Sequence, residues 1–539
     1  MQAKRFSVKS DVQVQKIKWI CYHPVETNPG KNIMSSQKDF EHLFDLSNTI
    51  CSFSSIAQLL SWDQETYMPK GGGEARSHQL AALASHIHKE KTSQKFKNAL
   101  AKLISLKTGK VKAQKLSHAQ KLALREWRKD FIKDTKIPNS FVKNFSKLTS
   151  QATMVWIDAK KNNSFKDFEP YLEKIFEMSR ERAKILGYKD HPYDALLNDF
   201  EPGMTSAKIS PIFSKLKKRL VALLHKVQDK KQIDNDFLKR PFSKEKQIEF
   251  GNVILNGLKV EKEHARLDES AHPFTISLHP TDTRFTTWIL EFGVMSNILS
   301  ILHEAGHAFY AMGLPVEYWG TPLCEATSLG IHESQSRWWE TIIGRSMDFW
   351  HHFYPLLQKT YPKEFKDVSL KRFYKAINVV EPSFIRVESD EMTYCLHIIL
   401  RFEMEKELLK GTFKVKDIPE AWNEKMKDLF GITPPDDSLG CLQDIHWAAG
   451  LVGYFPTYAL GNLYAAQFFQ VFEKEHPHWA KRVQKGDLPF IRDWLKEHIH
   501  SKGRMFSAEE LCKNITKKAL SEDAYINYLT EKYSEIYDF

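Results

Sequence analysis

The chain lacks the features that mark extracellular, fibrous and membrane-spanning proteins. Its 539 residues include only six cysteines, and none forms a C-x-x-C pair. This argues against a disulfide framework and against a structural zinc site made of thiolates, and it suits a reducing compartment. No run of about 20 apolar residues is present, so we expect no membrane span. The N-terminal residues also lack the apolar core of a signal peptide. We therefore predict a cytoplasmic protein.

Neither glycine and proline nor charge dominates the composition. The chain has 23 glycines and 22 prolines, which excludes a collagen-like or low-complexity protein. Its net charge is +11, and residues 89–136 are rich in Lys and Arg. A nucleic-acid-binding face is one interpretation of that segment, but no recognition motif accompanies the charge. We predict amphipathic helices with solvated basic faces and no nucleic-acid partner.

Helical periodicity dominates the chain from about residue 40 onward. Leu80, Leu83, Ala84 and Ile87, for example, recur at spacings of three and four. Short strands are expected only around 274–278 and 285–288. We predict a mostly α protein, with residues 1–37 as a poorly ordered N-terminal extension and residues 38–539 as a single helical domain.

The segment around residue 303 carries the clearest chemical signal. His303 and His307 are four residues apart in a helical pattern, so both imidazoles project from one face and can reach one metal ion. Glu304 follows the first histidine and can take a proton from a water that the metal activates. Random placement of residues would produce this H-E-x-x-H motif about 0.1 times in such a chain. The motif therefore predicts a hydrolytic zinc centre.

Such a centre needs a third protein ligand and an open fourth position. A histidine six residues after His307 would provide one solution, but Gly313 stands there. We therefore predict a carboxylate on a following helix, and Glu333 is the choice. Glu325 and Glu340 are competitors on spacing alone. His332 points about 100° away from its neighbour on a helix and is expected beside the centre or at the surface.

Several further motifs follow one another in the order known for one family. They are WDQETYMP at 62–69, HPF at 272–274, DTRFT at 282–286, HEAGH at 303–307, IHESQS at 331–336, IRVESDE at 385–391, GCLQDIHW at 440–447 and GYFPTY at 453–458. With these motifs the chain resembles the carboxypeptidase Taq family of zinc metallocarboxypeptidases from about Phe40 to its end. Ser389 replaces the family's usual alanine, and the first 35 or so residues match nothing in the family.

The resemblance implies a large helical fold of the gluzincin type, with two lobes around a deep active-site groove. It also implies a homodimer that binds one divalent metal per chain, most often zinc, with cobalt as a substitute. The implied activity is release of single C-terminal amino acids from peptides, with broad specificity and poor cleavage next to proline.

The resemblance also assigns roles to residues outside the metal motif. Tyr458 and His446 would stabilise the oxyanion, with Tyr454 as the nearby rival of Tyr458. Arg386 would bind the substrate's terminal carboxylate, because its rigid fork can grip both oxygens. From sequence alone, an ion pair of Arg386 with Glu388, Asp390 or another acidic residue is the favoured explanation. His272 would line the same subsites.

Three other functions remain open at this level. A zinc oligopeptidase or endopeptidase would share the catalytic centre but would need no carboxylate clamp. A binding protein on an inactive peptidase scaffold is disfavoured, because such a scaffold could lose Glu304 freely. A basic nucleic-acid-binding protein would reveal itself by salt-dependent binding to a generic duplex.

Overall fold

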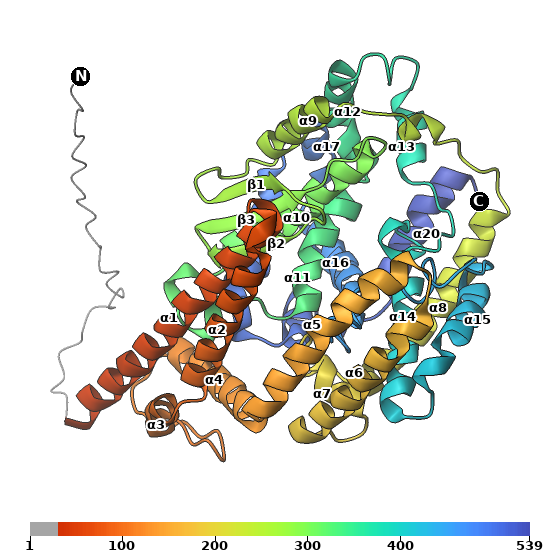
Figure 1. The fold of residues 1–539 in the computed structure, drawn as a ribbon. Coiled ribbons are helices and arrows are strands. Elements are labelled where there is room, and N and C mark those ends of the chain that lie inside the picture. The colour runs from red at the N-terminus through yellow and green to blue at the C-terminus, as the bar shows by residue number, and fades with distance from the viewer. Residues whose placement is uncertain (1–30) are drawn as a thin grey trace, which may run out of the picture.

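The computed structural model describes the backbone of residues 31–539, and side chains from Ser36 onward. Helices precede and follow one small sheet, α1 lies beside that sheet, and α2 packs on α1 (Figure 1). Helices α1 to α9 span Lys31–Thr66, Gly73–Lys91, Gln94–Leu103, His118–Lys136, Asn139–Lys161, Phe165–Leu186, Pro192–Leu197, Ser206–Gln228 and Lys244–Gly257. Strands β1 to β3 span Ala265–Glu269, Thr275–His279 and Asp282–Thr287.

The remaining helices complete a mostly α fold, as the sequence predicts. Helices α10 to α20 span Val294–Gly313, Leu329–Arg337, Met347–Thr360, Leu370–Ile377, Tyr394–Lys410, Ile418–Phe430, Pro456–Glu475, Trp479–Gln484, Pro489–His498, Ala508–Thr516 and Asp523–Tyr537. Helices α10, α11 and α16 pack together in the middle of the molecule (Figure 1). None of the described helices is both long and apolar enough to cross a membrane.

The sheet has the strand order β1-β3-β2. The central strand β3 runs parallel to β1 and antiparallel to β2, with Phe285 opposite both Leu267 and Thr275. The strand predicted at 274–278 matches β2 to within one residue, and the one predicted at 285–288 overlaps the second half of β3. Strand β1 was not predicted from the sequence. Because β2 lies at the edge of the sheet, one of its sides has no strand partner within the described residues.

Two hydrophobic cores hold the chain together. The larger one surrounds α10, α11, α14 and α16, and the smaller one joins α1, α3 and α4. In the smaller core, Leu100, Trp127 and Phe131 are buried on the inner faces of α3 and α4. Residues 89–136 therefore contain the amphipathic helices that their pattern predicts.

The predicted N-terminal extension lies mostly outside the described residues, which begin at residue 31. Helix α1 begins at Lys31, so the last seven residues assigned to that extension are already helical. The single domain at 38–539 and the two lobes around a groove stay predictions.

Candidate metal centre and active site

Two imidazoles project from the middle of α10, as predicted. The ring centroids of His303 and His307 lie 4.9 Å apart. Helix α10 is buried along most of its length, because apolar side chains surround it on several faces. Gly306 lets α11 approach closely, since a Cβ at this position would lie 2.5 Å from the backbone oxygen of Gln335.

Glu333 brings a third donor from α11. Its Oε2 lies 3.7 Å from Nε2 of His303 and 3.5 Å from Nε2 of His307, and the three ligand atoms all lie within 4.8 Å of one another. These separations exceed a normal hydrogen bond, and Oε1 of Glu333 is buried without a hydrogen-bond partner. Two imidazole nitrogens and a carboxylate around one point fit a divalent ion such as zinc.

The two competing carboxylates occupy other positions. Oε2 of Glu340 lies 2.7 Å from Nδ1 of His303, on the far side of the ring, and accepts a hydrogen bond from Arg337 at 2.7 Å. A carboxylate in this place orients a ligating imidazole. Glu325 instead pairs with Arg504 at 2.6 Å. Neither belongs to the group of three potential ligands.

Charges around His303 are strongly coupled. Burial disfavours the charged imidazole, but the Glu333 carboxylate and the hydrogen bond to Glu340 outweigh it and raise the pKa of His303 to about 9. Burial also opposes ionisation of Glu340, yet Arg337 and His303 lower the pKa of that carboxyl to about 2. The carboxylates are thus held in their charged form, which favours binding of a cation.

His332 lies on the other side of the centre. Its ring stacks on that of His307, with centroids 4.3 Å apart and an angle of 23° between the planes. The side chain is partly exposed. It is therefore a neighbour of the centre, as expected, and not one of its three donors.

The Glu304 carboxylate is buried beside the sheet edge. Only 5% of this residue is exposed, and Oγ1 of Thr275 donates a hydrogen bond of 2.5 Å to its Oε2. Thr275 is the first residue of β2, so the strand helps to fix the carboxylate. Sequence reasoning missed Thr275, although it directly follows the HPF motif at 272–274.

Two tyrosines and a histidine form a cluster at the start of α16. Oη of Tyr458 lies 3.1 Å from Nε2 of His446, and the rings of Tyr454 and Tyr458 are 5.3 Å apart. Burial lowers the pKa of His446 to about 3, so its imidazole is neutral near pH 7. Burial, followed by the Glu333 carboxylate, raises the pKa of Tyr454 above its usual value. Both phenols therefore keep their protons.

The loop that carries His446 is tied to α14 by a buried carboxylate. Glu405 accepts hydrogen bonds from Nε1 of Trp447 at 2.9 Å and from the backbone N–H of Gly453 at 3.1 Å. Burial raises the pKa of Glu405 to about 7. These bonds hold residues 446–453 in place at the entrance to α16.

Arg386 lies next to this cluster and is bound to Asp444. Its Nε and Nη2 donate to Oδ1 of Asp444 at 3.1 and 2.8 Å, and Nη1 donates to Oη of Tyr394 at 3.1 Å. The guanidinium lies 5.0 Å from the ring centre of Tyr458. Since a guanidinium has five N–H groups, one hydrogen on each Nη remains for another acceptor. Sequence reasoning foresaw an ion pair but did not identify Asp444.

His272 lies in the exposed connection between β1 and β2. Its ring faces Trp288, with the centroids 6.3 Å apart. His272 is therefore exposed, whereas Thr275, the residue that follows the HPF motif, contacts Glu304.

Comparison of the chain with known proteins identifies its family. Residues 42–533 match the model of the carboxypeptidase Taq (M32) metallopeptidases. The chain belongs to this family. It is 39% identical to thermostable carboxypeptidase 1 of Thermus thermophilus over 514 residues, covering 94% of this chain and 100% of the relative. It is 38% identical to carboxypeptidase 1 of Bacillus subtilis over 506 residues, covering 94% and 99%.

Solved structures agree with the family assignment. The M32 carboxypeptidase from Deinococcus radiodurans superposes with a TM-score of 0.90 at 34% identity, covering 93% of this chain and 100% of that one. The protein is therefore a metallocarboxypeptidase, a hydrolase of peptide bonds, and membership in a metallopeptidase family implies a divalent metal.

Proposed function

We propose that this M32 enzyme is a zinc-dependent carboxypeptidase that releases single C-terminal amino acids from peptides. The observation that carries the proposal is the convergence of His303, His307 and Glu333 beside the buried Glu304. Broad side-chain preference, poor cleavage next to proline, a homodimeric assembly and a cytoplasmic location belong to the same proposal. The family resemblance alone supports the first three, and the spacing of the six cysteines supports the fourth.

Zinc is the proposed ion, with cobalt as a functional substitute. Two imidazoles and one carboxylate are a common donor set for catalytic zinc, and one coordination position stays open for water or substrate. The ion, when bound, would activate the attacking water and polarise the scissile carbonyl. Glu340 would keep His303 oriented through Nδ1.

Glu304 is proposed to act first as general base and then as general acid. Its carboxylate would accept a proton from the attacking water and return it to the leaving amine. The bond from Thr275 engages Oε2, so the carboxylate keeps Oε1 for the water. The buried surroundings keep bulk water away from the transferred proton.

Tyr458 and His446 are proposed to stabilise the oxyanion. A phenol that keeps its proton can donate to the developing negative charge, and the neutral His446 at 3.1 Å can hold the Tyr458 hydroxyl in position. Tyr454 is the rival donor, because it lies near enough to Glu333 and Glu304 to sense both charges.

Arg386 is proposed to bind the terminal carboxylate of the substrate, with His272 lining the same region. The two free Nη hydrogens of Arg386 would make this contact while Asp444 holds the rest of the guanidinium. The same ion pair supports the alternative function, a zinc oligopeptidase or endopeptidase, because it accounts for Arg386 without any substrate.

Mass spectrometry of a peptide digest separates the two functions. A mixed library of free-acid peptides should give ladders that differ by single C-terminal residues, and a chelator should abolish them reversibly. Glu333→Ala should lose the metal and the ladders, whereas Glu325→Ala should keep both. Internal fragments as the main products would favour the endopeptidase.

A further inference from the structure

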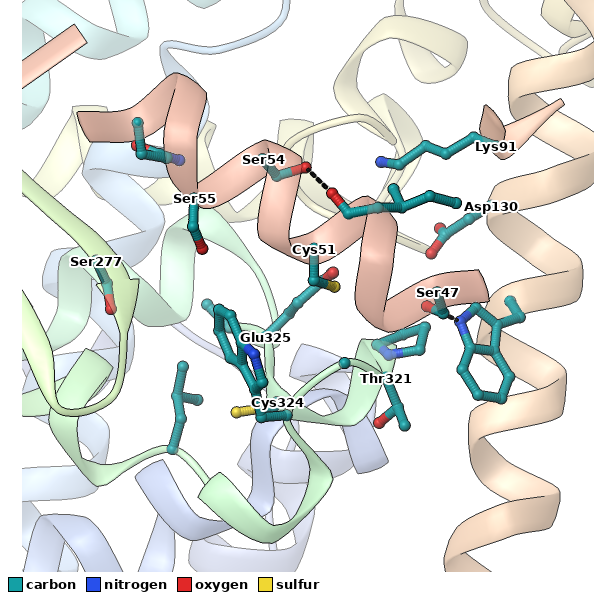
Figure 2. Close-up of a pocket in the computed structure, with 18 of the residues that line it drawn as sticks. Ser47, Cys51, Ser54, Ser55, Lys91, Asp130, Ser277, Thr321, Cys324 and Glu325 are labelled. Carbon is teal, nitrogen blue, oxygen red and sulfur yellow. Dashed lines mark hydrogen bonds between the residues drawn. The ribbon is translucent and has the colours of Figure 1, made fainter. Parts of the chain in front are cut away.

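A cavity of about 370 Å³ lies where the two hydrophobic cores meet. Its walls come mainly from α1, α3 and α4, from the C-terminal end of α10, from β2 and from residues 319–326. Figure 2 shows part of this lining, with Cys51 on α1 and Thr321 and Cys324 on the last segment. This volume falls in the range of sites that hold a small ligand or a few side chains. None of the catalytic or metal-binding roles described above uses these walls.

The cavity adjoins the metal centre through a shared neighbour. His332, which stacks on His307, is one of its lining residues. Ser277 of β2 is another, and β2 begins at Thr275, the residue bonded to Glu304. Ser277 lies two residues along β2 from Thr275, a separation of about 6–7 Å at ~3.3 Å per residue in a strand.

The proposed carboxylate clamp and the cavity connect to the centre through different histidines. Arg386 bonds to Tyr394, whose ring lies 4.8 Å from the guanidinium of Arg337. Arg337 in turn bonds to Glu340, the partner of His303. These contacts therefore lead from Arg386 to α10 at His303, the first of its two histidines.

The cavity adjoins the C-terminal end of α10. It touches His332 beside the later histidine, and then Ala311 and Leu314, which lie farther toward the C-terminal end of α10. A peptide with its C-terminus at Arg386 would therefore extend its N-terminal part along β2 toward the cavity.

The lining is mostly apolar. Aromatic side chains of Phe96, Trp127, Phe131 and Trp319 contribute to it, and Cys51 adds a thiol whose pKa burial raises to about 12, so that it is uncharged. Figure 2 shows Cys51 facing the segment that carries Cys324.

Charged groups at the cavity are largely compensated within the protein. Arg504 pairs with both Asp130 and Glu325, at 3.0 and 2.6 Å. Burial raises the pKa of Asp134 above its usual value, and Lys91 lines the cavity nearby. The walls therefore offer apolar contact more than an uncompensated charge, which favours an apolar ligand.

We propose that this cavity is a specificity subsite for a large apolar or aromatic side chain of the peptide substrate, two or three residues N-terminal to the scissile bond. The inference rests on the proposed carboxypeptidase function. An extended peptide would pass the edge strand β2 and place that side chain between α1 and residues 319–326.

Matched peptides test the subsite. Two acetylated, free-acid peptide series would carry Phe or Gly at the second or the third upstream position, and kcat/KM would be measured for each. The unmodified enzyme should prefer Phe by roughly tenfold or more at one of these positions. Cys51→Phe and Ser54→Phe place a ring in the cavity, so each should reduce that ratio toward one.

Ser52→Phe is the control, because Ser52 is an exposed neighbour on α1 that does not line the cavity. Ser52 and Ser54 both donate to the backbone oxygen four residues earlier, so the two substitutions remove the same kind of bond. The control should retain the Phe preference, and thermal unfolding would confirm that all variants fold.

Two results would overturn the subsite. One is the absence of any upstream preference in the unmodified enzyme, and the other is a preference that survives in both cavity-filling variants. Release of the last residue from an acetylated dipeptide, which ends before the cavity, tests the unmodified enzyme separately. No release from any free-acid substrate would count against the proposed function instead.

Discussion

Single side chains set the chemistry of the centre through their immediate neighbours. His303 presents Nε2 to the carboxylate of Glu333 because Glu340 occupies Nδ1. Glu304 is fixed from the sheet by Thr275. The metal donors and the proposed base thus belong to different hydrogen-bond networks, and substitution of one need not disturb the other.

The role of Glu304 can be tested without removing the metal. Glu304→Gln keeps the shape of the side chain but cannot accept the proton, so kcat should fall by about 10²–10⁴-fold. Elemental analysis should still find one divalent ion per chain. Near-normal kcat with the metal retained would remove Glu304 from the mechanism.

The two phenols can be ranked by the same kind of substitution. Tyr458→Phe deletes the hydroxyl that contacts His446 and should lower kcat by about 10²–10³-fold if its bond forms mainly in the transition state. Tyr454→Phe should cost less. Steady-state kinetics on one peptide decides this ranking, and the reverse order would exchange the two roles.

The sequence was most informative for residues that lie close together along the chain. The spacing of His303 and His307 predicts their shared face, and the need for a carboxylate on a following helix points to Glu333. The sequence did not reveal the contacts made by Thr275, Glu340 and Asp444. Along the chain these residues lie 29, 37 and 58 positions from their respective partners, Glu304, His303 and Arg386. No local pattern encodes such a contact.

Close helix packing determines where the ligands meet. Helix α16 passes α11 so closely that a Cβ on Gly461 would lie 2.5 Å from Cγ of Glu333. Gly306 serves the same purpose between α10 and α11. Glycine at these two positions therefore allows three helices to converge at the centre.

Gly461→Ala should weaken metal binding. The added methyl would push the Glu333 side chain away from the two imidazoles, and displacement of a ligand's support typically costs roughly 10–100-fold in affinity. Gly73→Ala is a matched control, since a Cβ at that position of α2 meets nothing within 4 Å. Competition with a chelator measures both affinities, and equal values would contradict the packing argument.

Helices with strong hydrophobic periodicity were predictable from the sequence, whereas strand β1 was not, for a physical reason. Strand β1 reads Ala-Arg-Leu-Asp-Glu, which is short and has no β-branched or aromatic residue. It is a strand because it pairs in parallel with β3. That partner lies beyond the intervening β2, so tertiary context and not local propensity decides its structure.

At the scale of the whole molecule, the helical fold brings residues from distant parts of the chain to one site. The candidate metal donors come from α10 and α11, the phenols from residues 454–458, and the proposed carboxylate clamp from residue 386. The sequence predicted the helical class and, through its resemblance, the family. The cavity between the two cores could not be foreseen, because it depends on how α1 packs against residues 319–326.

The proposed carboxypeptidase function requires the enzyme to recognise the free C-terminal carboxylate of a peptide. Arg386 would provide that recognition through a charge-assisted contact, which is about twice as strong as a neutral hydrogen bond. Arg386→Ala leaves Asp444 with a second partner, because Nε of Arg401 donates to its Oδ2 at 2.7 Å. The variant should therefore fold, which makes the residue suitable for a direct test.

The decisive measurement compares kcat/KM for one acetylated peptide with a free or an amidated C-terminus. We expect the amide to be cleaved roughly 10²-fold or more slowly, because it lacks the charge that Arg386 binds. We also expect Arg386→Ala to narrow that gap, and Arg386→Lys to restore only part of it, since a point charge cannot replace the fork. Efficient cleavage of the amidated peptide by the unmodified enzyme would contradict the account and favour an endopeptidase.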